Sequence, residues 1–299
     1  MIKNGVVQVL RLRNFSIYKQ LLLEESLYRR KDAGNWLIIN EGTPDPMIIM
    51  GISGRPDKLV HLEKAASLNI PIIKRYTGGG TVIVDHNTLF TSFIMNNDFI
   101  QQSSNNNHNS NNSNNNNSQS YLYPKDIMKW SEGYYKNVFI DYNDFSLQEH
   151  DYAFGNRKFG GNAQACSRTR FAHHTSFLFD YETDRMATLK QPEKIPTYRE
   201  NREHNSFLVK LKDRYDSHNT ISQLIIDAMT NLLLSNNNNN NDTAAVLDKD
   251  DSPSKMMMMV DCTLQDAMRY LNTSEDNIPS TVWLEPLDLL KQLELEKNK

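Results

Sequence analysis

Three consecutive glycines, Gly78, Gly79 and Gly80, stand between two apolar segments and follow the cations Lys74 and Arg75. Glycine lets the backbone adopt conformations closed to other residues and brings its N–H groups against a ligand with no Cβ in the way. Backbone donors beside Arg75 suit a carboxylate or a phosphate, although a glycine triplet can also form an ordinary hairpin turn. The spacing fits neither the phosphate-loop signature nor the dinucleotide fingerprint, so both of those families are excluded.

A second candidate is Lys158, which follows a predicted turn at Gly155 and Asn156 and precedes Gly160 and Gly161. One ammonium group beside a backbone without side chains can hold an anion. The same pattern also fits a surface hairpin with a solvated lysine. The residues alone leave both interpretations open.

The third candidate is the pair His173 and His174, which begins an apolar strand. Paired histidines suggest a metal site, but neighbours on a strand point to opposite faces. No cysteine or acidic cluster completes a ligand set. The sequence therefore does not predict a metal centre at this pair.

Together, these three segments resemble the catalytic domain of the lipoate-protein ligase family. Residues 75–82 with Asp85 resemble the family's Arg-Arg-x-Ser-Gly-Gly-Gly-Ala-Val-x-His-Asp segment, and residues 157–163 resemble its Arg-Lys-x-Ser-Gly-Ser-Ala. Residues 173–178 are similar to its His-His-Gly-Thr-Leu-Leu. The resemblance covers about residues 6–211 and implies a fold shared with biotin ligases and class II aminoacyl-tRNA synthetases.

The resemblance also implies a two-step reaction and the roles of the site residues. Lipoate, or octanoate, and ATP would give an acyl-adenylate, and a lysine of a lipoyl-domain acceptor protein would then attack the acyl carbon. Lys158 would hold the acyl carboxylate and the α-phosphate, and Asp151 would organise Mg2+. The acyl-adenylate pocket would be lined by Arg75, Thr77, Gly78, Gly79, Gly80, Asp85, Gly161, Asn162, Ala163 and His174.

The chain departs from the family pattern in several places. Val84 replaces a His, Gly160 a Ser, Thr175 a Gly, and His150 stands before Asp151 where Asn is usual. Residues 198–204, Tyr-Arg-Glu-Asn-Arg-Glu-His, form either a helix end packed by ion pairs or a distinctive part of the site.

Two other functions remain open. An ATP-independent octanoyl or lipoyl transferase needs a cysteine nucleophile. Such enzymes place this cysteine either before the motif lysine or after the strand that contains the histidines. Here those two regions hold Asn143 and residues 181–196, and neither contains a cysteine. Cys166 is expected to be a small core residue. A non-catalytic protein that binds the acyl group or the adenylate is the other alternative, whereas a biotin ligase is a weaker match to residues 75–80.

The elements that must position these residues follow from hydrophobic periodicity. Strands are predicted at residues 6–10, 36–40, 47–52, 70–75, 81–85 and 88–95, and helices after Ser16 and at residues 57–68 and 125–138. Ser16 and Asp57 are expected to cap their helices. Because strands come in adjacent pairs and helices interrupt them irregularly, the pattern predicts an α+β fold with mixed sheets.

Two Asn-rich tracts, residues 101–120 and 236–241, are too polar to offset the entropy of ordering and are predicted to be disordered insertions. The expected organisation is a catalytic domain of residues 1–215 and a small helical tail of residues 216–299, with a good amphipathic helix at 221–234 and a last helix near 286–295. Typical ligases of this type have a larger C-terminal domain. We therefore expect that domain to be reduced or absent here, or supplied by an accessory subunit.

The composition of the chain limits the kinds of partner that we expect it to bind. A net charge of −3 and a pI near 6.2 provide no basic field for nucleic acid or anionic membranes. Two cysteines cannot form a secreted disulfide scaffold, and no run of 18 apolar residues could span a bilayer. A cytoplasmic protein is expected, and a mitochondrial one is the alternative because the first 23 residues carry cations and no acid.

Overall fold

Alternating side chains along the first strand give the main sheet two buried faces. Val7 and Val9 belong to one apolar cluster, whereas Leu10 and Leu12 belong to another. Since successive side chains of a strand point to opposite faces, helices must cover both sides of the sheet. The computed structural model describes residues 6–104, 122–191, 195–200, 202–244, 258–271 and 278–297.

The main sheet has eight strands in the order β11-β1-β2-β6-β10-β9-β8-β7. The strand β1 runs parallel to both of its neighbours, and the other pairs are antiparallel. The strands are β1 (Val6–Arg13), β2 (Asn35–Glu41), β6 (Thr88–Asn96), β7 (Phe145–Gln148), β8 (Asp151–Phe154), β9 (Arg157–Cys166), β10 (Arg170–Leu178) and β11 (Met258–Cys262).

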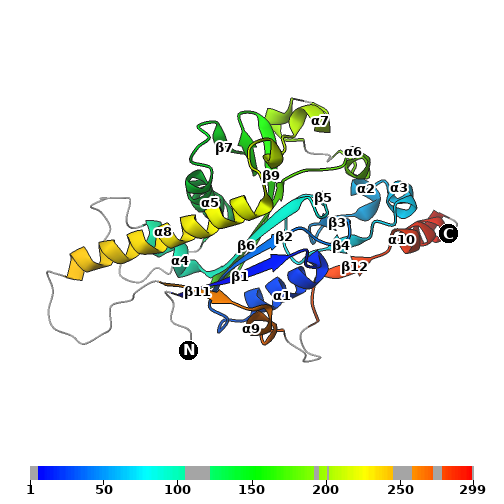
Figure 1. Cartoon of the computed structure of the whole chain (residues 1–299). Coiled ribbons are helices and arrows are strands. Elements are labelled where there is room, and N and C mark those ends of the chain that lie inside the picture. The colour runs from blue at the N-terminus through cyan, green and yellow to red at the C-terminus, as the bar shows by residue number, and fades with distance from the viewer. Residues whose placement is uncertain are drawn as a thin grey trace.

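Helices cover both faces of this sheet (Figure 1). On one face, α5 (Pro124–Val138) and α8 (His218–Ala244) contribute to a cluster that contains Leu37, Phe93 and Ile225. On the other, α1 (Ile17–Arg29) and α9 (Leu264–Met268) pack on a cluster around Trp36.

A second sheet has four strands in the order β12-β4-β3-β5, of which only β3 and β4 are parallel. These strands are β3 (Met47–Met50), β4 (Ile72–Lys74), β5 (Val82–Val84) and β12 (Val282–Leu284). The remaining helices are α2 (Pro56–Leu59), α3 (Leu62–Ser67), α4 (Asn97–Ser104), α6 (Thr183–Met186), α7 (His204–Phe207), α10 (Pro286–Lys297) and the 3-10 turns η2 (Thr197–Arg199) and η3 (Leu211–Asp213). The predicted α+β class with mixed sheets is confirmed.

Two local predictions were wrong. The single helix expected at residues 57–68 is divided into α2 and α3, because Val60 is extended and forms an isolated bridge with Leu189. Neither Asp57 nor Ser16 caps a helix through its side chain. The N–H of Ile17 donates instead to the Thr43 hydroxyl over 3.1 Å.

The tail is not only helical. Its strands β11 and β12 extend the two sheets beside β1 and β4, and α10 packs against α3. The predicted amphipathic helix is present as α8, but it continues through residues 236–241, where a disordered insertion was expected. Extending an existing helix avoids the unfavourable nucleation step, so the apolar first half can support the polar second half. The boundary between residues 215 and 216 stays a prediction.

The first four residues of the other Asn-rich tract, 101–104, are helical in α4 where disorder was expected, and residues 105–120 lie outside the described residues. Within the described part of the chain, no helix has the length and apolar character needed to cross a membrane.

Candidate functional site

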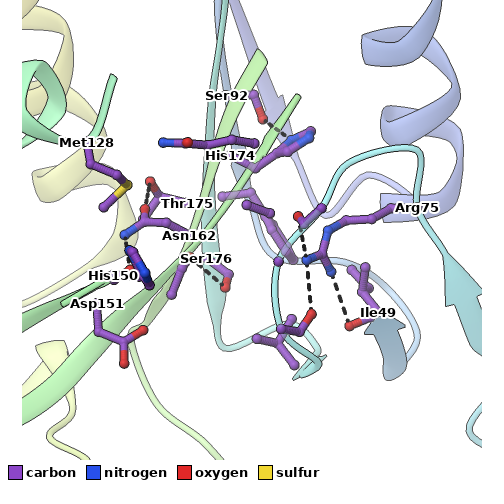
Figure 2. A pocket seen from close by; sticks show the side chains of 18 of the residues that line it. Ile49, Arg75, Ser92, Met128, His150, Asp151, Asn162, His174, Thr175 and Ser176 are labelled. Atoms are coloured by element: carbon purple, nitrogen blue, oxygen red, sulfur yellow. Dashed lines mark hydrogen bonds between the residues drawn. The ribbon is translucent and has the colours of Figure 1, made fainter. Parts of the chain in front are cut away.

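A cavity of about 820 Å³ lies where α1, the small sheet and the main sheet meet. One part of its wall is apolar and comes from Ile17, Leu21, Ile49, Val82 and Phe90. Another part comes from α5 and the β7–β8 turn. Figure 2 shows Met128, His150 and Asp151 on one side of the pocket and Arg75 with Ile49 on the other, with residues of β9 and β10 between them.

The loop between β4 and β5 is fastened to both sheets. The N–H of Gly78 donates to the Gln164 carbonyl of β9 over 3.0 Å, and that of Ile52 donates to the Thr77 carbonyl over 3.0 Å. Gly79 has φ +118, and a Cβ there would lie 2.7 Å from Nη2 of Arg75 and 3.1 Å from the Ala163 Cβ. Glycine is therefore required by both the backbone conformation and the close packing.

Arg75 holds this loop from inside. Its side chain donates to the Thr77 hydroxyl at 2.8 Å and to the carbonyls of Gly78 and Gly80 at 3.2 and 2.9 Å. Burial lowers the pKa of Arg75 to about 10, so its guanidinium remains cationic near neutral pH. No carboxylate within the described residues forms an ion pair with it, so its charge stays available to attract an anion in the cavity.

A β-bulge directs Lys158 into the cavity. Tyr152 pairs with Gly160, but Ala153 pairs with Lys158, so Phe159 is an extra residue on β9. Consequently the Phe159 side chain lies in the aromatic core, and a Cβ added at Gly160 would point into the same core. Lys158 comes to share a face with Gly161, where an added Cβ would lie 3.4 Å from Nζ. Bulges commonly re-aim a side chain next to a functional site.

Asp151 fixes the ammonium group. Its Oδ1 lies 2.8 Å from Nζ of Lys158, and its Oδ2 accepts a hydrogen bond of 2.9 Å from the Tyr198 hydroxyl. Each oxygen of Asp151 thus accepts from one protein donor and keeps a second lone pair, so its role toward Mg2+ stays a prediction.

Asn162 connects three elements of the wall. Its amide nitrogen donates to the His150 carbonyl at 2.9 Å, and its oxygen accepts from the Thr175 hydroxyl at 2.7 Å (Figure 2). Thr175, which departs from the glycine of the family pattern, therefore supplies a hydrogen bond that orients Asn162.

A buried acid completes the apolar side of the cavity. Oε2 of Glu24 lies 2.6 Å from Nδ1 of His174, and its Oε1 accepts from Gln20 at 2.7 Å and from Ser92 at 2.6 Å. Glu24 was missed by the sequence analysis. Its place on α1, on the same helical face as Ile17 and Leu21, was the available signal, because an acid on an apolar face needs a partner.

His173 points to the opposite side of β10 and is fully buried. It stacks on Phe93, and its Nδ1 lies 3.0 Å from the Gln164 amide. The expectation that this pair forms no metal site agrees with the opposite orientations of the two rings, because only His174 reaches the cavity.

Most of the predicted site residues line this one cavity. They are Arg75, Gly78, Gly79, Gly80, Asp151, Lys158, Gly161, Asn162, Ala163 and His174. Thr77 and Asp85 do not. Thr77 is buried and accepts a hydrogen bond from Arg75 within the loop, whereas Asp85 forms an ion pair with Arg185 and accepts from the Asn87 N–H. Lys125, Lys129 and Met128 of α5 line the cavity and were not predicted.

The chain resembles known proteins in sequence, in fold and in its match to a family model. The chain is 28% identical over 267 residues to a Plasmodium falciparum protein named inactive lipoate–protein ligase 2, covering 70% of this chain and 64% of that protein. It therefore spans less than two thirds of the length of this relative.

Two solved structures share the fold. One is a bipartite lipoate protein ligase from Thermoplasma acidophilum, described with its E2 lipoyl domain, with a TM-score of 0.62 and 15% identity over 88% of this chain and 89% of that one. The other is a lipoate-protein ligase A bound with ATP, with a TM-score of 0.57 and 18% identity over 77% and 86% of the two chains.

The model of the lipoyl protein ligase A/B catalytic domain matches residues 16–233, which include the glycine loop, Lys158, the His173–His174 strand and the first part of α8. The protein belongs to the lipoyl protein ligase A/B catalytic domain family.

Proposed function

We propose that the protein is an ATP-dependent lipoate-protein ligase, which activates lipoate or octanoate as an acyl-adenylate and transfers the acyl group to a lysine of a lipoyl-domain protein. The observation that carries the proposal is the position of Lys158. Its ammonium lies on the wall of a cavity of about 820 Å³ that also has an apolar lining.

The proposed reaction has two steps. In the first step an oxygen of the acid attacks the α-phosphorus of ATP, and pyrophosphate leaves. Lys158 can contact both the carboxylate and the α-phosphate, because only one of its three donors is directed to Asp151. A fixed cation stabilises the negative charge that is redistributed at this step. In the second step the acceptor amine attacks the acyl carbon, and AMP leaves.

The partners in this proposal come from the solved relatives. The T. acidophilum protein is bipartite and is described with its E2 lipoyl domain, and the ligase A structure contains ATP. These names support a lipoyl-domain acceptor, ATP as co-substrate and an accessory subunit in place of a larger C-terminal domain.

A non-catalytic acyl- or adenylate-binding protein is the second candidate, because the relative from P. falciparum is named inactive. The transferase alternative is less well supported. Cys166 was expected to be a small core residue, but it is exposed at the end of β9 and absent from the residues that line the cavity.

The test is exchange of labelled pyrophosphate into ATP, measured with lipoate, octanoate and biotin in turn. A ligase exchanges with lipoate or octanoate, Lys158→Ala loses this exchange while staying folded, and Cys166→Ser retains it. Acid binding without exchange would support the binding-protein candidate, and loss of acyl transfer in Cys166→Ser would support the transferase.

A further inference from the structure

Thr197 and Arg202 attach a short segment to the two ends of the β8–β9 hairpin. The N–H of Thr197 donates to the Glu149 carboxylate before β8, over 2.5 Å. The Arg202 guanidinium donates to the Asn156 carbonyl at the hairpin turn and to the Tyr198 carbonyl, at 2.8 and 2.7 Å. This short segment therefore spans the hairpin that carries both Asp151 and Lys158.

Phe207 supports the segment from behind. The Tyr198 ring packs on Phe207 with centroids 5.2 Å apart, and the guanidinium groups of Arg199 and Arg202 lie 4.9 and 5.5 Å from the same ring. Arg199 is 4% exposed, and its Nε donates to the Arg202 carbonyl at 2.9 Å. The position of the Tyr198 side chain is thus fixed by packing that does not depend on its hydroxyl.

The hydroxyl itself reaches the site. Tyr198 and Lys158 donate to different oxygens of the same carboxylate, at 2.9 and 2.8 Å. A tyrosine hydroxyl keeps its proton at neutral pH, so beside a carboxylate it donates to Asp151. A carboxylate held on one oxygen by a fixed donor presents its other oxygen in a defined direction.

We propose that Tyr198 is a positioning residue, which acts through Asp151 to hold the Lys158 ammonium where the reacting carboxylate and phosphate meet. This role deepens the proposed ligase function and rests on it. Lysine has a flexible four-carbon stem, so its ammonium is placed accurately only when a partner is itself fixed. Holding the cation before the anions arrive reduces the reorganisation needed during adenylation.

Tyr198→Phe removes only the hydroxyl and keeps the ring on Phe207. Its matched control is Tyr142→Phe, which removes a hydroxyl that donates to the Arg214 carbonyl at 2.8 Å, away from the cavity. We expect Tyr198→Phe to lower kcat for lipoate-dependent pyrophosphate exchange by roughly 10- to 100-fold, with KM for the acid changed by less than about threefold. Tyr142→Phe should leave both parameters unchanged.

A double-mutant cycle with Asp151→Ala tests whether Tyr198 acts through the carboxylate. If it does, Tyr198→Phe adds no further loss of kcat when Asp151 is already absent. The proposal is overturned if the two substitutions lower kcat independently, so that their fold-losses multiply in the double variant. It is also overturned if Tyr198→Phe leaves kcat unchanged, or if Tyr142→Phe lowers kcat equally.

The wild type, the two single variants and the double variant are also compared by thermal melting, which requires no enzymatic activity. If the wild-type protein exchanges pyrophosphate with none of the acids, the ligase proposal fails, whereas the contact is still tested by the melting temperatures. Non-additive shifts for Tyr198→Phe and Asp151→Ala support the Tyr198–Asp151 contact, and additive shifts refute it.

Discussion

His173 is a fully buried residue next to the site, and its environment makes stability depend on pH. Burial, with a smaller contribution from His174, lowers the pKa of His173 to about 3, from an ordinary value of 6.5. Below pH 6.5 the unfolded chain therefore binds a proton that the folded protein does not. The contribution of His173 to the free energy of unfolding is therefore complete above pH 6.5 and is lost as the pH drops from there toward 3.

From about pH 7.5 to about pH 5.5 we expect His173 alone to remove about 1.4 kcal/mol from the free energy of unfolding, as measured in urea. His173→Gln cannot be protonated and should show a correspondingly smaller loss over this interval, whatever its stability at pH 7.5. His61→Gln controls for the loss of an exposed histidine. Equal losses in wild type and His173→Gln would show that the buried ring is not the cause.

At the scale of elements, the conformation of the loop between β4 and β5 depends on Gly79 more than on Gly80. Gly79→Ala places a Cβ against Arg75 and Ala163 at a positive φ, whereas a Cβ on Gly80 would meet no atom within 4 Å. We expect Gly79→Ala to lower the free energy of unfolding by about 1–3 kcal/mol and Gly80→Ala to change it much less. Chemical denaturation of the two variants checks this, and equal effects would mean that the loop relaxes freely.

Periodicity predicted most elements because their apolar faces are long, as in β6 and α5. It failed where long-range contacts decide the structure. Val60 leaves a helical pattern to bridge Leu189, and Met258 and Val282 begin strands that form only beside β1 and β4. The site showed the same division. The motifs located Lys158, and residues 198–204 were identified as either a helix end or a part of the site, but only the structure shows that Tyr198 contacts Asp151.

At the scale of the whole molecule, the described part of the tail packs against the main sheet. Ile221, Ile225, Met229 and Leu233 of α8 are buried in the same cluster as Phe93 and Phe177 of the main sheet. The hydroxyl of Tyr134 on α5 also donates to the Ile225 carbonyl. Residues on either side of the predicted boundary at 215 therefore share one core, so we expect them to unfold together.

Ile225→Ala tests this coupling, because Ile225 is completely buried and lies beyond the boundary. Removing its side chain leaves a cavity in the shared core and should cost about 2–5 kcal/mol. Leu234→Ala, on the same helix at a side chain that is 55% exposed, should cost much less. With a single core, circular dichroism and tryptophan fluorescence shift together in Ile225→Ala. Two separate transitions, with only one of them moved, would instead show that the tail folds as its own unit.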